Sequence, residues 1–468
     1  MKRLLCILLT GLMLFSSWGC ITTPPEEDPV THAASGTLEP IELPYEEPTV
    51  TDDPIPDNLI EITEPTTTDV LTTDVSTTDE PTTDVPMPEI GGYDDFMRVV
   101  SAVLVDGKGN RNFSPISVYL ALAMVTEGAR GETQAELLKL LGCETVEQLR
   151  GVCAGMLETL SVDEDGSTID LHNSLWMAQE IGGTPVTFRE SFLKELSDTY
   201  RSEANTVWFG TSDAVDQISK WIVRCTRGKI KISPDALQFD PGTLAVLINT
   251  IYLKDKWSVM FDPLHTESGV FYGVDPETQQ PVESDVSYLN RFDRNTTVTQ
   301  GDGWLRYRVS LCNVGYVVFV LPDEGVSLAD LLGSPDAIRK LLTEGINHPF
   351  DVSLRIPKFS FQDKMELSDV LKALGLTHCF GNADFSGMSD APCRFDRVLQ
   401  ESYIGVNEYG VEAAAYTMVS TKNTQFSPVV RDRIDFHLTR PFLYAIESRD
   451  GTVLFVGTVT MPTASAQN

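Results

Sequence analysis

An abrupt change in composition at Tyr93 is the feature that most limits how this 468-residue chain can fold. Residues 21–90 contain 18 Asp or Glu and no Lys or Arg, and Thr and Pro make up much of the rest. Within this stretch the triplet Thr-Thr-Asp recurs every five residues, at 67–69, 72–74, 77–79 and 82–84. Such a segment cannot bury enough apolar surface to offset the entropy of ordering it. We therefore predict a disordered acidic tether over residues 21–92 and one folded domain over residues 93–468.

The charge of the tether accounts for much of the acidity of the chain. Residues 21–90 supply 18 of the 33 units of net negative charge, and the remainder is only mildly acidic. This balance argues against a nucleic-acid partner, because neutralising phosphates requires a basic surface. Seventy residues of flexible chain have a root-mean-square reach of about 45–50 Å. A cell-wall or sugar-binding module is the alternative for this stretch, but it would use aromatic residues, in which the stretch is poor.

Residues 1–20 have the layout of an export signal. After two basic residues, an apolar stretch runs from Leu4 to Phe15, and it is too short to span a membrane comfortably. The Gly-Cys pair ending at Cys20 resembles a bacterial lipobox, although Ser17 and Trp18 depart from its usual residues. We expect an exported protein held at the cell surface by a lipid on Cys20, and ordinary secretion with cleavage nearby is the alternative.

The folded part shows no arrangement of residues that points to an enzyme. It has no Walker loop, no G-x-G-x-x-G after a strand, no H-E-x-x-H and no G-x-S-x-G elbow. Its five histidines are isolated from acid or cysteine partners in any recognisable motif: His172, His265, His348, His378 and His437. We therefore predict neither catalytic residues nor a cofactor.

Six cysteines remain after the signal, and their spacing is not that of a metal site. They form no C-x-x-C pair and have no histidine at ligand spacing, which argues against bound zinc. Export makes disulfides possible, but the sequence leaves their pairing open. Cys143 and Cys153 are the closest pair along the chain, and the others are Cys225, Cys312, Cys379 and Cys393.

The order of helical and strand patterns predicts an α+β domain. Apolar residues at helical spacing begin at Phe96, and residues 114–142 read as two helices with Ser117 and Thr133 as caps. Strand patterns follow at 244–253, 314–322, 351–361 and 452–462. Helices first and long strands later, with few helices between them, favour an α+β fold over a doubly wound parallel one.

Five ordered stretches together resemble the serpin family over residues 93–462. The stretch 112–142 (NFSPISVYLALAMVTEGARGETQAELLKLLG) is similar to the N-terminal signature of the family. The others lie at 218–230, 247–266, 354–389 and 440–462. The resemblance implies about nine helices around a large mixed or antiparallel main sheet, two smaller sheets and an exposed reactive-centre loop. It also implies that Trp257 lies at the top of the main sheet, where the loop enters.

The segment VNEYGVEAAAYT (406–417) then aligns with the hinge motif of the family. The resemblance assigns the hinge to Glu408, Gly410, Val411, Glu412, Ala413, Ala414, Ala415 and Thr417. Tyr409, Val411 and Tyr416 depart from the usual residues, and Gln400 stands where histidine is frequent beneath the sheet. A helix is the alternative for this alanine triplet, but the nearby β-branched residues weaken it.

The hinge has the residue pattern of a strand that could enter a sheet. With period two, Val411, Ala413, Ala415, Thr417, Val419 and Thr421 share one face, and every one of them is small or β-branched. The charged Glu412 and the large Tyr416 fall on the other face. A shift of one residue would bury Glu412 without a partner, which costs several kcal/mol. Gly410 supplies the bend at the entry, and no proline interrupts residues 410–427.

The resemblance implies a serine-type protease inhibitor that traps its target covalently. The target protease, of serine or cysteine type, would cleave the loop and form an acyl-enzyme. The loop would then insert and carry the protease about 50–55 Å over sixteen residues. Family spacing places the cleaved bond between Thr424 and Gln425, which suits proteases that accept small uncharged residues. Lys422, for a trypsin-like target, and Phe426, for a chymotrypsin-like one, are the alternatives.

Other functions remain open at this point. One is a serpin that no longer inhibits and acts as a surface-tethered binding protein. Another is a tethered solute-binding protein or hydrolase, which would need the ligand or catalytic residues that are missing here. For the inhibitor we expect a monomer whose partners are a protease and, through the lipid, a membrane.

Overall fold

The computed structural model describes residues 90–164, 166–230, 239, 242–391, 393–395, 398–411 and 431–462. The helices of these residues are α1 (Tyr93–Leu104), α2 (Pro115–Gly128), α3 (Gly131–Leu140), α4 (Val146–Thr159), α5 (Glu190–Tyr200), α6 (Ser212–Cys225), α7 (Leu328–Leu331), α8 (Ala337–Thr343) and α9 (Ser368–Ala373). Short 3₁₀ turns cover Pro263–His265 and His378–Phe380. None of the helices in these ranges combines the length and apolar character needed to cross a membrane.

Both helix caps predicted from the sequence lie at other residues. Helix α2 begins at Pro115 with Ser114 at the cap position, since proline at the first helical position has no N–H to leave unsatisfied. Ser117 lies inside the first turn, where its hydroxyl accepts from Ser114. Helix α3 begins at Gly131, and the Thr133 hydroxyl accepts from the backbone N–H of Asp384 instead of capping its own helix.

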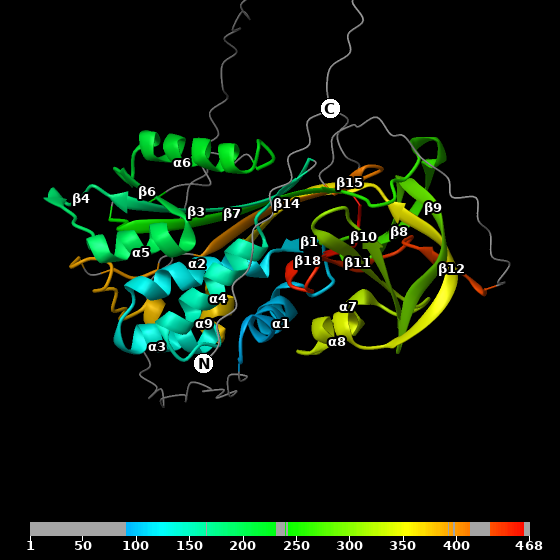
Figure 1. Cartoon of the computed structure of the whole chain (residues 1–468), viewed down its shortest axis with the longest axis horizontal. Helices are drawn as coiled ribbons and strands as arrows, with labels where there is room; N and C mark the ends of the chain where they lie inside the picture. The colour runs from blue at the N-terminus through cyan, green and yellow to red at the C-terminus, as the bar shows by residue number, and fades with distance from the viewer. Residues whose placement is uncertain are drawn as a thin grey trace, which may run out of the picture. The chain divides into compact units, whose positions relative to one another are not determined.

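A seven-stranded sheet carries the hinge. Its order is β13-β14-β15-β7-β3-β2, and β6 pairs with β3. The strands are β2 (Val162–Glu164), β3 (Ser167–Ala178), β6 (Ser202–Val207), β7 (Ala245–Lys256), β13 (Phe359–Glu366), β14 (Leu399–Asn407) and β15 (Gly410–Val411). Helix α6 lies over one face of this sheet, and α2 and α5 lie against the other (Figure 1).

A nine-stranded sheet forms the other half of the domain. Its order is β1-β18-β17-β11-β10-β9-β12-β16, with β8 paired to β9. The strands are β1 (Arg111–Phe113), β8 (Glu267–Val274), β9 (Pro281–Gly301), β10 (Trp304–Ser310), β11 (Gly315–Pro322), β12 (Ile346–Pro357), β16 (Arg433–His437), β17 (Phe442–Ser448) and β18 (Val453–Val459). Helices α1, α7 and α8 lie beside it (Figure 1). A small third sheet pairs β4 (Glu180–Ile181) with β5 (Thr184–Pro185).

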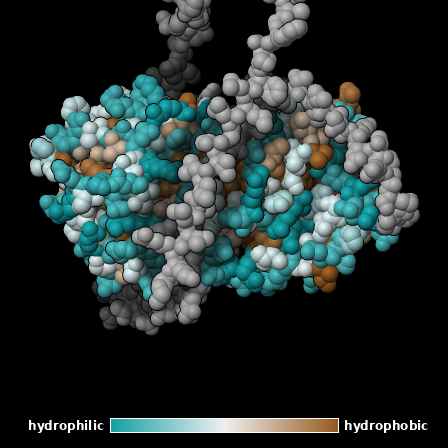
Figure 2. Space-filling model, in the orientation of Figure 1, coloured by the Kyte–Doolittle hydropathy of each residue, from teal (hydrophilic) through white to brown (hydrophobic). Residues whose placement is uncertain are grey.

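Both faces of the seven-stranded sheet are buried, and each face packs against a different cluster of hydrophobic residues. The main core fills the space between the two large sheets and the N-terminal helices. A second cluster joins the opposite face to α6 through Trp176, Ile218, Trp221 and Ile222. The face of the domain shown in Figure 2 is mostly hydrophilic, with hydrophobic residues in small patches.

The predicted α+β class is confirmed, with nine helices in the described ranges, a large mixed sheet and smaller sheets. One predicted strand is wrong, because residues 351–361 are divided at Lys358 between β12 and β13, which belong to different sheets. The six cysteines after the signal all lie in the described residues, and no disulfide joins them there.

Candidate functional site

The chain turns back into the seven-stranded sheet at Glu408 and Tyr409. Strand β14 ends at Asn407, and β15 then lies antiparallel both to β14, through Val406 and Val411, and to β7. In the described residues β7 and β14 are joined through β15 and do not pair with each other. The hinge predicted from the sequence therefore begins between two sheet strands.

Gly410 occupies a position at which no side chain fits. A Cβ at this position would lie 2.0 Å from the backbone oxygen of Asp255 in β7. Its φ of 156° also suits glycine better than other residues. The close approach allows the chain to enter the sheet directly after a two-residue turn.

Glu408 is held in place at the turn by two side chains from other elements. Its Oε1 accepts hydrogen bonds from Lys358 Nζ at 2.9 Å and from Thr266 Oγ1 at 3.0 Å, and its side chain is 9% exposed. Burial disfavours the carboxylate, but the bonds from Lys358 and Thr266 outweigh it and lower the pKa of Glu408. The turn is thus anchored by an ionised glutamate.

Trp257 braces the same turn from the end of β7. Its indole Nε1 donates to the backbone oxygen of Asn407 at 2.8 Å, and its backbone N–H donates to Tyr409 at 3.0 Å. The side chain is 1% exposed and meets Phe261 edge to face at 5.8 Å between ring centroids. Trp257 thus contacts the turn through both its indole and its backbone.

Asp255 and Lys358 are part of the site, and the sequence analysis missed both. Asp255 lies opposite Val411, is fully buried, and accepts from the backbone N–H groups of Asn313 at 2.9 Å and Val314 at 2.7 Å. The Ser167 hydroxyl also donates to it. An aspartate inside the apolar strand LINTIYLKDKW is the signal that could have revealed the first residue. Lys358 alone separates β12 from β13, so the crossing between the two sheets carries it to Glu408.

Gln400 replaces the frequent histidine beneath the sheet and makes a pair of hydrogen bonds of its own. Its Oε1 accepts from the backbone N–H of Ser114 at 3.0 Å, and its Nε2 donates to the backbone oxygen of Ser114 at 2.8 Å. This pair ties β14 to the start of α2 through a side chain that does not titrate.

The face on which Val411 lies is the inner face of the sheet. Val411, its partner Val406 and Asp255 are buried, and Leu253 and Ile404 follow them in the main core. The alternate residues of β14 and β7 point to the opposite side, where Tyr403, Val246 and Ile248 pack against the cluster beneath α6. Val411 itself is 2% exposed and belongs to the main core.

The other predicted site residues lie outside the described residues. They are Cys20, the hinge residues Glu412, Ala413, Ala414, Ala415 and Thr417, and the reactive-bond candidates Lys422, Thr424, Gln425 and Phe426. Within the described ranges, no group of three or more His, Cys, Asp or Glu is arranged to hold a metal ion.

Comparison with known proteins gives one consistent result. The family model "Serpin (serine protease inhibitor)" matches residues 96–462. The chain is 31% identical to Serpin-Z2B of Triticum aestivum, with 76% of this chain and 91% of the relative covered. It is also 31% identical to the alpha-1-antiproteinase of Callosciurus caniceps, covering 75% and 83%. The native structure of the thermophilic serpin Tengpin superposes with a TM-score of 0.67 at 24% identity, over 79% of this chain and 93% of that one.

Proposed function

This chain belongs to the serpin family, and from that premise we propose that it inhibits a serine protease by inserting its cleaved loop into the seven-stranded sheet. Members of the family are mostly protease inhibitors rather than enzymes. Insertion as an added strand is the known behaviour of serpin reactive loops. The observation that carries the proposal is the position of β15, antiparallel between β14 and β7.

Continuing the register of β15 places the small hinge residues on the inner face. Ala413 would lie level with Leu253 and Ile404, both of which belong to the main core. Ala415 and Thr417 would follow on the same side. A large or charged side chain at these levels would meet the core, so their small size supports insertion.

The same register places the charged Glu412 and the large Tyr416, which would be costly to bury in the main core, on the opposite face of the sheet. Glu412 would lie level with Lys254, on the face away from the main core, and the two charges would be neighbours. Tyr416 would lie level with Thr250 on that same face. The hinge therefore avoids burying an unpaired charge in the core.

The length of β7 also fits the proposed mechanism. Strand β7 has twelve residues, and the register continued from Gly410 reaches Thr421 opposite Ala245, at its far end. The reactive-bond candidates at 422–426 begin immediately after that point. Insertion would thus bring an attached protease to the far end of the sheet. Each new backbone hydrogen bond contributes about 1 kcal/mol.

We place the cleaved bond between Thr424 and Gln425. The protease serine Oγ would attack the Thr424 carbonyl, the peptide C–N bond would break, and Gln425 would leave as a free amine with the serine proton. The product is an ester between the protease and Thr424. A threonine at this position suits proteases of elastase or subtilisin type.

The test is to incubate the full chain with elastase-, subtilisin-, trypsin- and chymotrypsin-type proteases and look for an SDS-stable complex. We expect a complex with the first two and a released peptide that begins at Gln425. Thr424→Arg should transfer complex formation to trypsin, whereas Ser427→Arg, beyond the bond, should not. Cleavage without a complex for every protease would support the non-inhibitory binding protein instead. A peptide beginning at Asn423 or Ser427 would move the bond to Lys422 or Phe426.

We further propose that the inhibitor is exported and anchored to a membrane by a lipid on Cys20, with residues 21–92 as the tether. The export layout of residues 1–20 and the acidic composition of the following stretch support this. The full-length protein should partition into detergent and Cys20→Ala should not. Partition of both into the aqueous phase would indicate plain secretion.

A further inference from the structure

A polar pocket far from the hinge in sequence lies between the nine-stranded sheet and the end of α8. It has a volume of about 620 Å³ and is lined by residues of β9, β10 and β12 and of the end of α8. Two arginines of β10, Arg306 and Arg308, line it, and none of its described lining residues is acidic. In a chain with a net charge of −33, such a pocket is unusual.

Arg306 is a buried cation, and among the described residues only Glu447 favours its charge, from beyond ion-pair distance. It is 6% exposed, and no carboxylate of the described residues forms an ion pair with it. Its Nη1 donates to the backbone oxygen of Leu341 at 2.6 Å, and its Nη2 lies 3.4 Å from Thr299 Oγ1. Burial, and then the charge of Arg308, lower the pKa of Arg306 to about 10. Both of these act against the cationic form, and the carboxylate of Glu447 opposes them only in part, so a further anion nearby would favour the cation.

The two arginines that line the pocket are only partly neutralised by their ion-pair partners. Arg308 pairs with Glu447 at 3.1 Å, which leaves one carboxylate for two guanidinium groups. The carbonyl end of α8 supplies part of a negative charge through Leu341, but a helix end offers only about half a charge, and α8 is short. Counting only the lining residues and their ion-pair partners, one positive charge is therefore in surplus.

Neutral hydrogen-bonding groups complete the lining. Asn347, Thr299 and Arg306 lie directly opposite one another on three neighbouring strands, β12, β9 and β10. Asn347 Oδ1 accepts from Thr299 Oγ1 at 2.7 Å, so the NH₂ group of Asn347 remains a donor. Thr297 also lines the pocket. Cationic and neutral donors thus line one cavity.

We propose that this pocket binds a tetrahedral oxyanion, a phosphate or a sulfate. Guanidinium groups donate in pairs to such oxygens, and the hydroxyl and amide groups can supply further bonds. The volume leaves room for a small organic group that carries the anion.

The test is isothermal titration of the full chain with inorganic phosphate, sulfate and acetate, with ionic strength held constant by sodium chloride. We expect phosphate and sulfate to bind and acetate to bind at least tenfold more weakly. Arg308→Gln should weaken phosphate binding by tenfold or more. Arg339→Gln is the matched control, because its side chain is 44% exposed and paired with Glu344, while that of Arg308 is 47% exposed and paired with Glu447. It should change binding less than twofold.

A second variant keeps both arginines. Asn347→Asp preserves the acceptor for Thr299 and adds a negative charge to the pocket, so it should abolish phosphate binding without loss of the folded state. No binding beyond that of chloride would overturn the proposal, as would equal weakening by Arg308→Gln and Arg339→Gln. Acetate binding as tight as that of phosphate would overturn the tetrahedral class of the ligand.

Discussion

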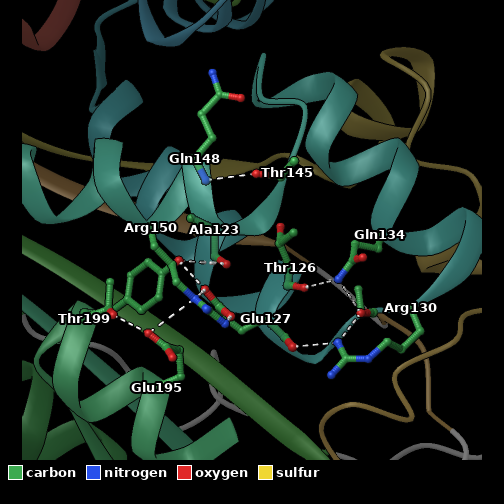
Figure 3. Close-up of polar contacts among 12 residues, drawn as sticks. Ala123, Thr126, Glu127, Arg130, Gln134, Thr145, Gln148, Arg150, Glu195 and Thr199 are labelled. Atoms are coloured by element: carbon green, nitrogen blue, oxygen red, sulfur yellow. Dashed lines mark hydrogen bonds and ion pairs between the residues drawn. The ribbon is translucent and has the colours of Figure 1, made fainter.

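Two buried glutamates, Glu127 in the helical layer and Glu408 at the hinge, are held in different ways. Both carboxylate oxygens of Glu127 accept from Arg150 of α4, at 2.9 and 2.6 Å (Figure 3). The Tyr200 hydroxyl of α5 also donates to Glu127, at 3.0 Å. The two bonds from other side chains to Glu408 both end on Oε1. A bidentate arginine fixes orientation as well as charge, whereas a single lysine acts as a point charge.

The different ways in which Glu127 and Glu408 are held fit the different roles of the helical layer and the hinge. Glu127 lies at the C-terminal end of α2, where the helix dipole disfavours a negative charge, so its partners must compensate for both burial and the dipole. It joins three helices that stay together. Glu408 holds only the two-residue turn at 408–409. The chain that follows this turn is proposed to move during insertion. Glu127 should therefore determine stability, and Glu408 should determine inhibition.

Removing the Glu127 carboxylate should have the largest effect on stability. Glu127→Ala removes both bonds to Arg150 and the acceptor of the buried Tyr200 hydroxyl. The Arg150 side chain is 34% exposed and keeps Glu195, so we expect a loss of about 2–3 kcal/mol in the free energy of unfolding. Denaturant unfolding of the full chain measures it. Glu195→Ala is the control, since Glu195 is the second and more exposed acid near Arg150, at 3.3 Å. A loss below about 1 kcal/mol for Glu127→Ala would show that the two glutamates do not differ as argued.

A charged side chain on the inner face of the hinge should have the next largest effect. It should reduce inhibition and leave stability unchanged. Ala415→Arg would place a charge level with Ile251 on the core side, and we expect it to turn the inhibitor into a substrate, with at least tenfold less SDS-stable complex. Tyr416→Arg, one residue along and on the outer face, is the matched control and should retain most of the complex. If Tyr416→Arg is the more damaging of the two, the proposed register is shifted by one residue.

Weakening the contacts that hold Glu408 at the turn should have a smaller effect on stability and on inhibition. Glu408→Gln removes the charge that Lys358 and Thr266 hold, and we expect about 1–2 kcal/mol less stability and a several-fold lower yield of protease complex. Lys358→Gln should give a similar loss. The double variant should lose little more than either single one, because both act on the same ion pair. Fully additive losses would argue against this pair as the anchor.

The sequence predicts the face on which each hinge residue lies, because alternation in a strand is a local property, and of these residues only Glu408, Gly410 and Val411 lie in the described part of the chain. It could not predict the anchors of Glu408. Lys358 reaches the turn because the chain crosses between sheets at that residue, and Thr266 comes from a turn far away in sequence. The helical pattern of α1 is likewise only partly informative. Val103 continues the apolar spacing that runs from Phe96 through Val99 and Val100, yet it is 53% exposed. Contacts between residues that are distant in sequence depend on the topology of the fold, so no local sequence pattern predicts them.

The smallest effect we predict is the pH dependence of the hinge anchor. The folded-state pKa of Glu408 lies below its ordinary value of 4.5 because the bonds from Lys358 and Thr266 outweigh burial. The carboxylate therefore stabilises the fold fully above about pH 4.5, and this contribution is lost as pH falls through the folded-state pKa. The difference in unfolding free energy between the natural chain and Glu408→Gln should be constant from pH 8 to 5 and shrink towards zero below 4.5. Taking the difference cancels the titration of the other acids. A difference that grows on acidification would mean that Glu408 is protonated when the hinge is closed, and would remove the ion pair from the argument.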